Sequence, residues 1–78
     1  MGDNMITVRV CADGNSRPVR NVRVALNFDG LFRGKASDEW TDGSGEAQFD
    51  CDIGQGKVLV SGQPVYRGQL AGRIVVYV

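Results

Sequence analysis

The chain has 78 residues, of which 42% are hydrophobic and 23% charged, with nine basic side chains, nine acidic side chains and no histidine. This length predicts a single domain, residues 1–78, with a small core and little room for a deep active site. The zero net charge excludes the global positive field that attracts nucleic acid, and no apolar run approaches the ~18 residues of a membrane helix. We therefore expect neither nucleic acid nor a membrane among its partners.

Apolar and polar residues alternate with a period of two along most of the chain, which is the pattern of half-buried strands. The runs in chain order are 6–11, 22–28, 47–53, 58–60 and 74–78, with weaker candidates at 32–41 and 65–70. No stretch has convincing helical periodicity. The sequence therefore predicts an all-β protein.

Glycine, next to Asp, Asn or Ser at most sites, separates these runs and supplies the positive φ angles that tight turns need. The turn segments are 13–15, 29–30, 42–45, 54–56 and 61–62. Asp29-Gly30 predicts a hairpin, and Asp42–Gly45 is expected to reverse the chain between Trp40-Thr41 and Glu46. We expect the large Trp40 ring to cover one end of the core.

About seven short strands, with turn signals every 8–12 residues, predict a seven-stranded antiparallel immunoglobulin-like sandwich. A five-stranded small β-barrel is the alternative for so short a chain.

Two segments resemble a known superfamily. "PVRNV" at 18–22 and "TDGSGEAQF" at 41–49 are similar to the "g.pv.na.V.l" and "tTd..G.a.f" patterns of transthyretin-like or carboxypeptidase-regulatory-like sandwiches, which include the Cna protein B-type domains of surface adhesins. The resemblance covers about residues 5–61. It implies a transthyretin-like sandwich, but its motifs are turn and core residues and specify fold better than function.

The resemblance also brings in two activities that the chain does not match. Hydroxyisourate hydrolysis depends on histidines and a C-terminal Tyr-Arg-Gly-Ser tail, whereas here Tyr66-Arg67-Gly68 is internal and His is absent. The self-formed isopeptide bond of adhesin domains needs Lys on the first strand and Asn or Asp on the last. The predicted first strand carries Arg9, and the last strand, 74–78, carries neither Asn nor Asp. We expect no catalytic residues, no cofactor and no enzymatic activity.

Cys11 and Cys51 are the only cysteines. Cys51 falls on the apolar side of its predicted strand and Cys11 on the polar side of its own, and opposite faces of a sandwich are too far apart for a disulfide. A bulge in either strand would shift the register and allow the bond. Parity predicts an exposed Cys11 and a core thiol at Cys51. Two cysteines without His do not suit a structural zinc site.

Six acidic residues and no basic ones lie within 36–56, while 57–78 holds three bases and no acid. Either paired strands neutralise one another, which we favour, or an acidic edge meets a basic partner. Asp42, Ser44 and Glu46 alternate as calcium ligands can. Asp and Gly are also what the turn alone demands, and the full calcium-loop signature is absent. We therefore expect a hairpin and no metal.

The last strand carries apolar residues on both faces. Arg73, Val75 and Tyr77 lie opposite the side of Ile74 and Val76. Such a strand is either central and covered or displays an apolar patch, and an exposed edge invites strand addition or a homodimer. The alternative is that Tyr77 covers a neighbouring strand.

We expect a non-enzymatic structural or protein-interaction module that acts through strand edges and surface loops, with Arg73, Val75 and Tyr77 as its interaction edge. The alternative is a carbohydrate- or small-ligand-binding module that uses Phe32, Trp40 and Tyr66 for stacking. The expected partner is a protein of unknown identity or a second copy of the chain. The expected location is cytoplasmic if Met1 is the native start, and extracellular if the chain is excised from a longer secreted protein.

Overall fold

The computed structural model of the chain describes residues 5–12, 17–30, 34–35 and 38–78. The strands in chain order are β1 (Met5–Cys11), β2 (Arg23–Phe28), β3 (Gly34–Lys35), β4 (Glu39–Trp40), β5 (Glu46–Asp50), β6 (Gly54–Val60), β7 (Gln63–Leu70) and β8 (Arg73–Tyr77). Among these residues no helix has the length and apolar character that crossing a membrane requires.

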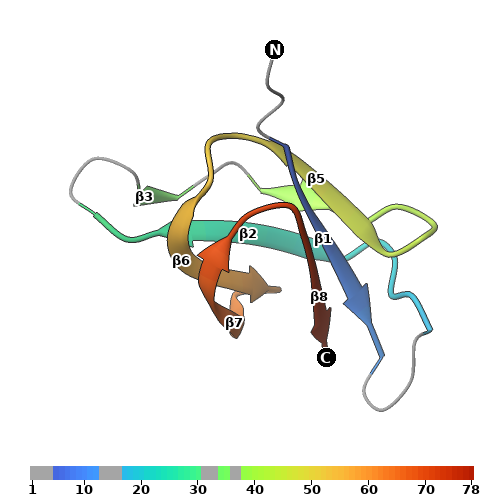
Figure 1. The fold of residues 1–78 in the computed structure, drawn as a ribbon. Helices are drawn as coiled ribbons and strands as arrows, with labels where there is room; N and C mark the ends of the chain where they lie inside the picture. Colours follow the sequence, from blue (N-terminus) through green and yellow to red (C-terminus); the bar gives the residue numbers. More distant parts are fainter. Residues whose placement is uncertain (1–4, 13–16, 31–33, 36–37) are drawn as a thin grey trace.

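The strands form two packed sheets (Figure 1). The smaller sheet has the order β5-β1-β8, and the larger sheet has the order β3-β2-β6-β7, with β4 also paired to β2. Since β3 and β4 pair with successive parts of β2, they act as one interrupted edge strand. Counted in this way, the described residues form seven strands in sheets of three and four, without a closed barrel. The predicted sandwich is confirmed, and the barrel alternative is wrong.

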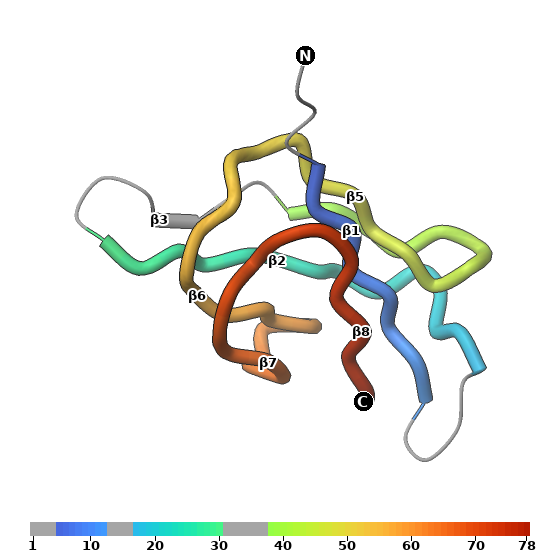
Figure 2. The backbone as a smooth tube through the Cα atoms, viewed as in Figure 1, coloured from blue at the N-terminus to red at the C-terminus, as the bar shows by residue number. Residues whose placement is uncertain are grey.

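One strand pair departs from the antiparallel arrangement that the sequence predicts. All strand pairs of the described residues are antiparallel except β1 and β8, which run parallel. Figure 2 shows β8 beside β1, the two strands running in the same direction. The first and last strands of the fold are therefore neighbours.

The core lies between the two sheets and is built from alternate residues of the strands. These side chains point inward because the pleat sends every second side chain to the same face, and burying their apolar surface is the main favourable term in folding. The buried cluster consists of Ile6, Val8, Val10, Val24, Leu26, Phe28, Ala47, Phe49, Val58, Val60, Leu70, Ile74 and Val76.

Thr41 fastens the segment before β2 to the connection between β4 and β5. Its hydroxyl donates to the carbonyl of Val19 at 2.8 Å and accepts from the N–H of Val22 at 3.1 Å. Its own N–H donates to the carbonyl of Val22 at 3.0 Å, and the N–H of Asn21 donates to its carbonyl at 3.1 Å. A buried polar side chain is stable here because each of these groups has a partner.

The turn that follows Thr41 packs directly on β1, and only glycine fits at its end. Gly45 has a φ of +74°, and an added Cβ would lie 2.8 Å from the carbonyl oxygen of Val10 and 2.9 Å from the Cβ of Pro18. The N–H of Val10 donates to the Gly45 carbonyl at 2.7 Å. The Asp42–Gly45 stretch is thus a chain reversal, as predicted, and it also closes over the end of β1.

Trp40 does not cover the core, so that prediction is wrong. Its side chain is 64% exposed. β4 is a two-residue edge strand, in which Trp40 pairs with the exposed Arg23 on the outer face of the larger sheet. Phe28 and Phe49 supply the aromatic part of the core instead.

Two predicted strand boundaries are also wrong. Gly54–Gly56, predicted as a turn, begins β6, because Gly56 lets this strand approach the backbone of β2. The strand predicted over 47–53 ends at Asp50, and Ile53 is 51% exposed. The alternation of apolar and polar residues in the sequence continues to Ile53, although the chain leaves the smaller sheet after Asp50.

Cys11 and Cys51 are not joined by a disulfide, and they lie near opposite ends of β1. Asp50, next to Cys51, pairs with Met5, whereas Cys11 lies six residues further along. At ~3.3 Å per residue this is roughly 20 Å, against the ~7 Å between Cα atoms that a disulfide tolerates. Distance along the strand, rather than the face of the sheet, excludes the bond.

The prediction of an exposed Cys11 is wrong, because its side chain is only 2% exposed. The end of β1 is flanked on both sides, by Tyr77 of β8 and by Pro18 through an isolated bridge. Cys51 is half-buried and packs against the core.

We expect Ellman's reagent to modify the native chain in two phases, with Cys51 reacting first, because a buried thiol is reached only after local opening. The Cys51→Ser variant should lose the fast phase. Unfolding without a reductant should expose both thiols to an alkylating reagent, and an unalkylated chain would contradict the separation of the cysteines.

Candidate functional site

The outer edge of β8 is the main candidate. Among the described strands, β8 pairs with β1 alone. The N–H of Thr7 donates to the Gly72 carbonyl at 2.8 Å, and the N–H of Val78 donates to the Cys11 carbonyl at 3.0 Å. Because alternate residues of a parallel strand turn their N–H and C=O to the same neighbour, the even-numbered residues of β8 bond to β1. The residues that turn their backbone groups away from β1, here named the β8 edge, are Arg73, Val75 and Tyr77.

The side chains beside these backbone groups are largely apolar and exposed. Val75 is 43% exposed and Tyr77 is 55% exposed on the outer face, while Ile74 and Val76 are buried on the inner face. The sequence left open whether this strand is central or displays a patch, and the structure places it at an edge of the smaller sheet with its outer face exposed.

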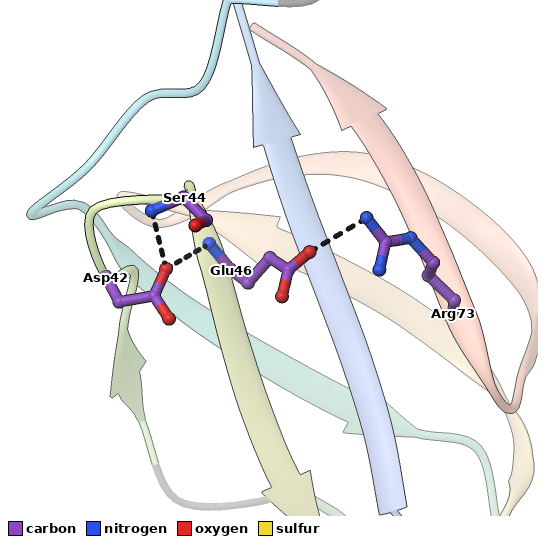
Figure 3. A network of polar contacts seen from close by, with 4 residues as sticks. All are labelled: Asp42, Ser44, Glu46 and Arg73. Carbon is purple, nitrogen blue, oxygen red and sulfur yellow. Dashed lines mark hydrogen bonds and ion pairs between the residues drawn. The ribbon is translucent and has the colours of Figure 1, made fainter.

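The one charged side chain of β8, that of Arg73, is directed toward β5 rather than toward the open side of β8. Arg73 forms an ion pair with Glu46 of β5, with 2.8 Å between Nη2 and Oε2. Figure 3 shows the Glu46 side chain lying across β1 to reach Arg73. The backbone N–H of Glu46 in turn donates to Asp42 Oδ1 at 3.1 Å, and the N–H of Ser44 donates to the same oxygen at 2.9 Å. These contacts link the turn to β8 across all three strands of the smaller sheet.

These turn contacts lower the pKa of Asp42 below its ordinary value of 3.8. The N–H of Glu46 has the largest effect, followed by the N–H of Ser44, since both stabilise the carboxylate form. A carboxyl group with a lowered pKa is deprotonated near neutrality, so it has no proton to donate, and its carboxylate is a weak base. Asp42 thus serves as a turn acceptor and is poorly suited to acid–base catalysis.

A lowered pKa in the folded state means that Asp42 contributes stability above its unfolded pKa, and that this contribution is lost as the pH falls through the folded pKa. We expect the carboxyl resonance of Asp42 to titrate below 3.8. We also expect Asp42→Asn to reduce the loss of stability between about pH 5 and pH 2. NMR titration measures this pKa. A pKa of Asp42 at or above the ordinary value would contradict its hydrogen bonds to the N–H groups of Ser44 and Glu46.

The other sheet edges carry features that oppose strand addition, which β8 lacks. β7 has a register shift opposite Val58 and Leu59 and contains Pro64. The β3–β4 edge is interrupted and short. β5 presents the exposed acidic side chain of Asp50. Among the described edges, β8 is therefore the one whose pairing groups lie beside apolar side chains and no free charge.

The aromatic residues predicted to bind a ligand do not form one platform. Trp40 lies on β4 and Tyr66 on β7, at opposite edges of the larger sheet, and three strand spacings of ~4.8 Å put them at least about 14 Å apart. Tyr66 shares a face with the buried Val58 and donates its hydroxyl to the Gln69 carbonyl at 3.0 Å. Phe32 lies outside the described residues. A binding role for these three residues stays a prediction.

Two shallow depressions lie on the larger sheet. One has a volume of about 430 Å³ and is lined by Lys57, Pro64, Val65, Tyr66 and Arg67. The other has about 220 Å³ and is lined by Arg23, Ala25, Asn27, Asp38, Leu59 and Gly62. Neither lining contains a serine, threonine or cysteine. Among the residues that the structure describes, no cluster of Cys, Asp and Glu could hold a metal ion.

Opposite charges meet across the strands, in line with the favoured interpretation of the uneven charge distribution. Besides the pair of Glu46 and Arg73, Asp38 Oδ2 lies 3.9 Å from Arg23 Nε. Asp29 Oδ2 lies 3.9 Å from Arg67 Nη2. Ion pairs formed within the fold in this way need no external partner.

No protein-family model, curated protein or solved structure matches this chain. Its fold is an all-β sandwich of two sheets, and no family is identified.

Glu46 is the one residue of the site that the sequence analysis missed as a partner of the β8 edge. The sequence carries little sign of this contact, because Glu46 and Arg73 are far apart in the chain and no local pattern connects them. The ion pair becomes visible only once β5 and β8 are known to flank β1.

Proposed function

We propose that the chain is a non-enzymatic protein-interaction module that takes up an extended strand of a protein partner along the β8 edge. The outward-facing backbone groups of Arg73, Val75 and Tyr77, set beside exposed apolar side chains, are the observation that carries this proposal.

Strand addition explains both affinity and specificity at such an edge. Hydrogen bonds between the two backbones supply affinity, and alternate side chains supply specificity. One set of partner side chains would extend the inner face beside Ile74 and Val76, where apolar residues fit. The other set would lie on the outer face beside Val75 and Tyr77.

We further infer that the chain is a transthyretin-like or carboxypeptidase-regulatory-like sandwich. The residues that carry the resemblance have matching roles, since Thr41 and Gly45 build the turn and Phe49 lies in the core. The adhesin isopeptide bond does not follow from this assignment, because Arg9 of β1 lies opposite Val75 of β8.

Site-directed photo-crosslinking tests the interaction function. A benzoylphenylalanine probe at position 73 or 77 of the full chain should give discrete adducts in the cells that produce the protein. The two probes should map to partner residues about four apart, as strand pairing requires. A probe at Gln48, on the opposite edge of the same sheet, is the control. No discrete adduct from either β8 probe, or the same adducts from all three positions, would contradict the proposal.

A second candidate function is supported by Trp40, the most exposed of the large hydrophobic residues in the described part of the chain. An exposed indole can stack on a sugar ring, so a carbohydrate-binding role would change the fluorescence of Trp40 on a glycan panel. A silent panel would remove this candidate. Because the chain has no other tryptophan, the control for a positive signal is calorimetric titration of the Trp40→Ala variant with the same glycan, which should show no binding.

A further inference from the structure

We propose that the strand taken up by the β8 edge is the β8 strand of a second copy of this chain, paired antiparallel about a twofold axis at Val75. This inference rests on the proposed function and names its partner. The two smaller sheets would then join into one continuous sheet.

The backbone of β8 is self-complementary in this register. An axis at Val75 places Val75 opposite itself, and Arg73 opposite Tyr77 of the second copy. All of these residues turn their N–H and C=O outward. Facing residues of this kind exchange two hydrogen bonds per pair in an antiparallel ladder, so the contact would hold about six. The hydrogen bonds between β8 and β1 would all be kept, because they are made by the even-numbered residues of β8.

The side chains agree with the same register. On the outer face, the exposed Val75 side chains meet at the axis, and each Arg73 lies beside a Tyr77 ring. Arg73 stays paired with Glu46 across its own sheet, so no like charges face each other. On the inner face, Ile74 of one copy lies opposite Val76 of the other, which extends the apolar core rows.

Neighbouring registers are less favourable. An axis at Arg73 would place two guanidinium groups opposite each other, and like charges directly opposite are destabilising. An axis at Tyr77 would leave Arg73 and Val75 without partners inside the strand. Val75 is therefore the one odd-numbered position of β8 that gives full overlap without a charge conflict.

The size of the contact sets the expected strength. β8 has five residues, so the contact falls below the ~1,200 Å² at which standard interfaces begin. We expect a weak, reversible dimer with a Kd on the order of 100 μM.

Sedimentation equilibrium of the full chain over a concentration series tests the dimer. We expect a monomer–dimer equilibrium that Val75→Lys weakens at least about tenfold, because it places like charges at the axis. Gln48→Lys introduces the same charge on the opposite edge of the sheet and should leave the equilibrium unchanged. Mixing the Val75→Lys and Val75→Glu variants should restore association, because opposite charges then meet at the axis.

A chain that stays monomeric up to millimolar concentration would overturn the dimer. So would a dimer that Val75→Lys leaves intact, or that Gln48→Lys weakens equally. Amide hydrogen exchange of the dilute monomer separates this failure from that of the proposed function. If Val75 and Tyr77 exchange rapidly in a chain that does not self-associate, the dimer is rejected. The proposed function then stands, because the β8 edge is open to another protein partner. Slow exchange at both amides removes both proposals.

Discussion

Replacing Gly56 with alanine is expected to lower the free energy of unfolding by about 3 kcal/mol. An added Cβ would overlap the carbonyl oxygen of Asn27 and would lie 2.9 Å from the Cα of Phe28. Both atoms belong to the backbone of β2, which cannot move aside as a flexible side chain can. The alanine therefore forces β6 away from β2 at the centre of the larger sheet. This is a large share of the roughly 4–12 kcal/mol that a domain of this size has in total.

Gly43→Ala is the matched control for Gly56→Ala. No heavy atom lies within 4 Å of the position of its added Cβ. We expect its unfolding free energy to change by less than about 0.5 kcal/mol. Urea denaturation followed by circular dichroism measures both variants, because the exposed Trp40 is a poor probe of unfolding. Equal effects of the two substitutions would contradict the close approach of β6 to β2.

Replacing Thr41 with valine is expected to lower the free energy of unfolding by about 2–4 kcal/mol. Valine has nearly the same shape, but it leaves the N–H of Val22 and the carbonyl of Val19 without their hydroxyl partner. Thr41 is only 3% exposed, so water cannot readily replace the hydroxyl. The cost arises from two polar groups left unpaired near the core.

Thr41→Ser separates the hydroxyl from the methyl group. Serine keeps both hydrogen bonds and removes one buried methyl, so it should cost only about 1 kcal/mol. Urea denaturation of the two variants gives the comparison. If valine proves as stable as threonine, the Thr41 hydroxyl does not fasten the segment before β2.

The strands that face the core could be predicted from the sequence because one face of each strand is buried, which requires an apolar residue at every second position. Alternation in 6–11 and 22–28 matches β1 and β2 closely. Gly54–Gly56 was misassigned because glycine indicates a turn in sequence, and the close approach that requires it depends on β2. Trp40 was misassigned because the burial of an aromatic residue depends on whether its strand is central or at an edge.

The candidate site was predictable in its residues but not in its arrangement. Apolar residues on both faces of 74–78 singled out Val75 and Tyr77. Which backbone groups face outward depends on the parallel pairing of β1 with β8, which no local pattern encodes. The contact between Glu46 and Arg73 also depends on strand order. Local periodicity reports which face a residue occupies and is silent on which strands are neighbours.

The central claim is that the β8 edge is open, and amide hydrogen exchange of the dilute chain tests it most directly. The account predicts protected amides at Ile74 and Val76, whose N–H groups face β1, and faster exchange at Val75 and Tyr77 by on the order of 100-fold. Uniform protection of all four amides would show that the edge is already paired within the chain. That result would contradict strand addition at β8.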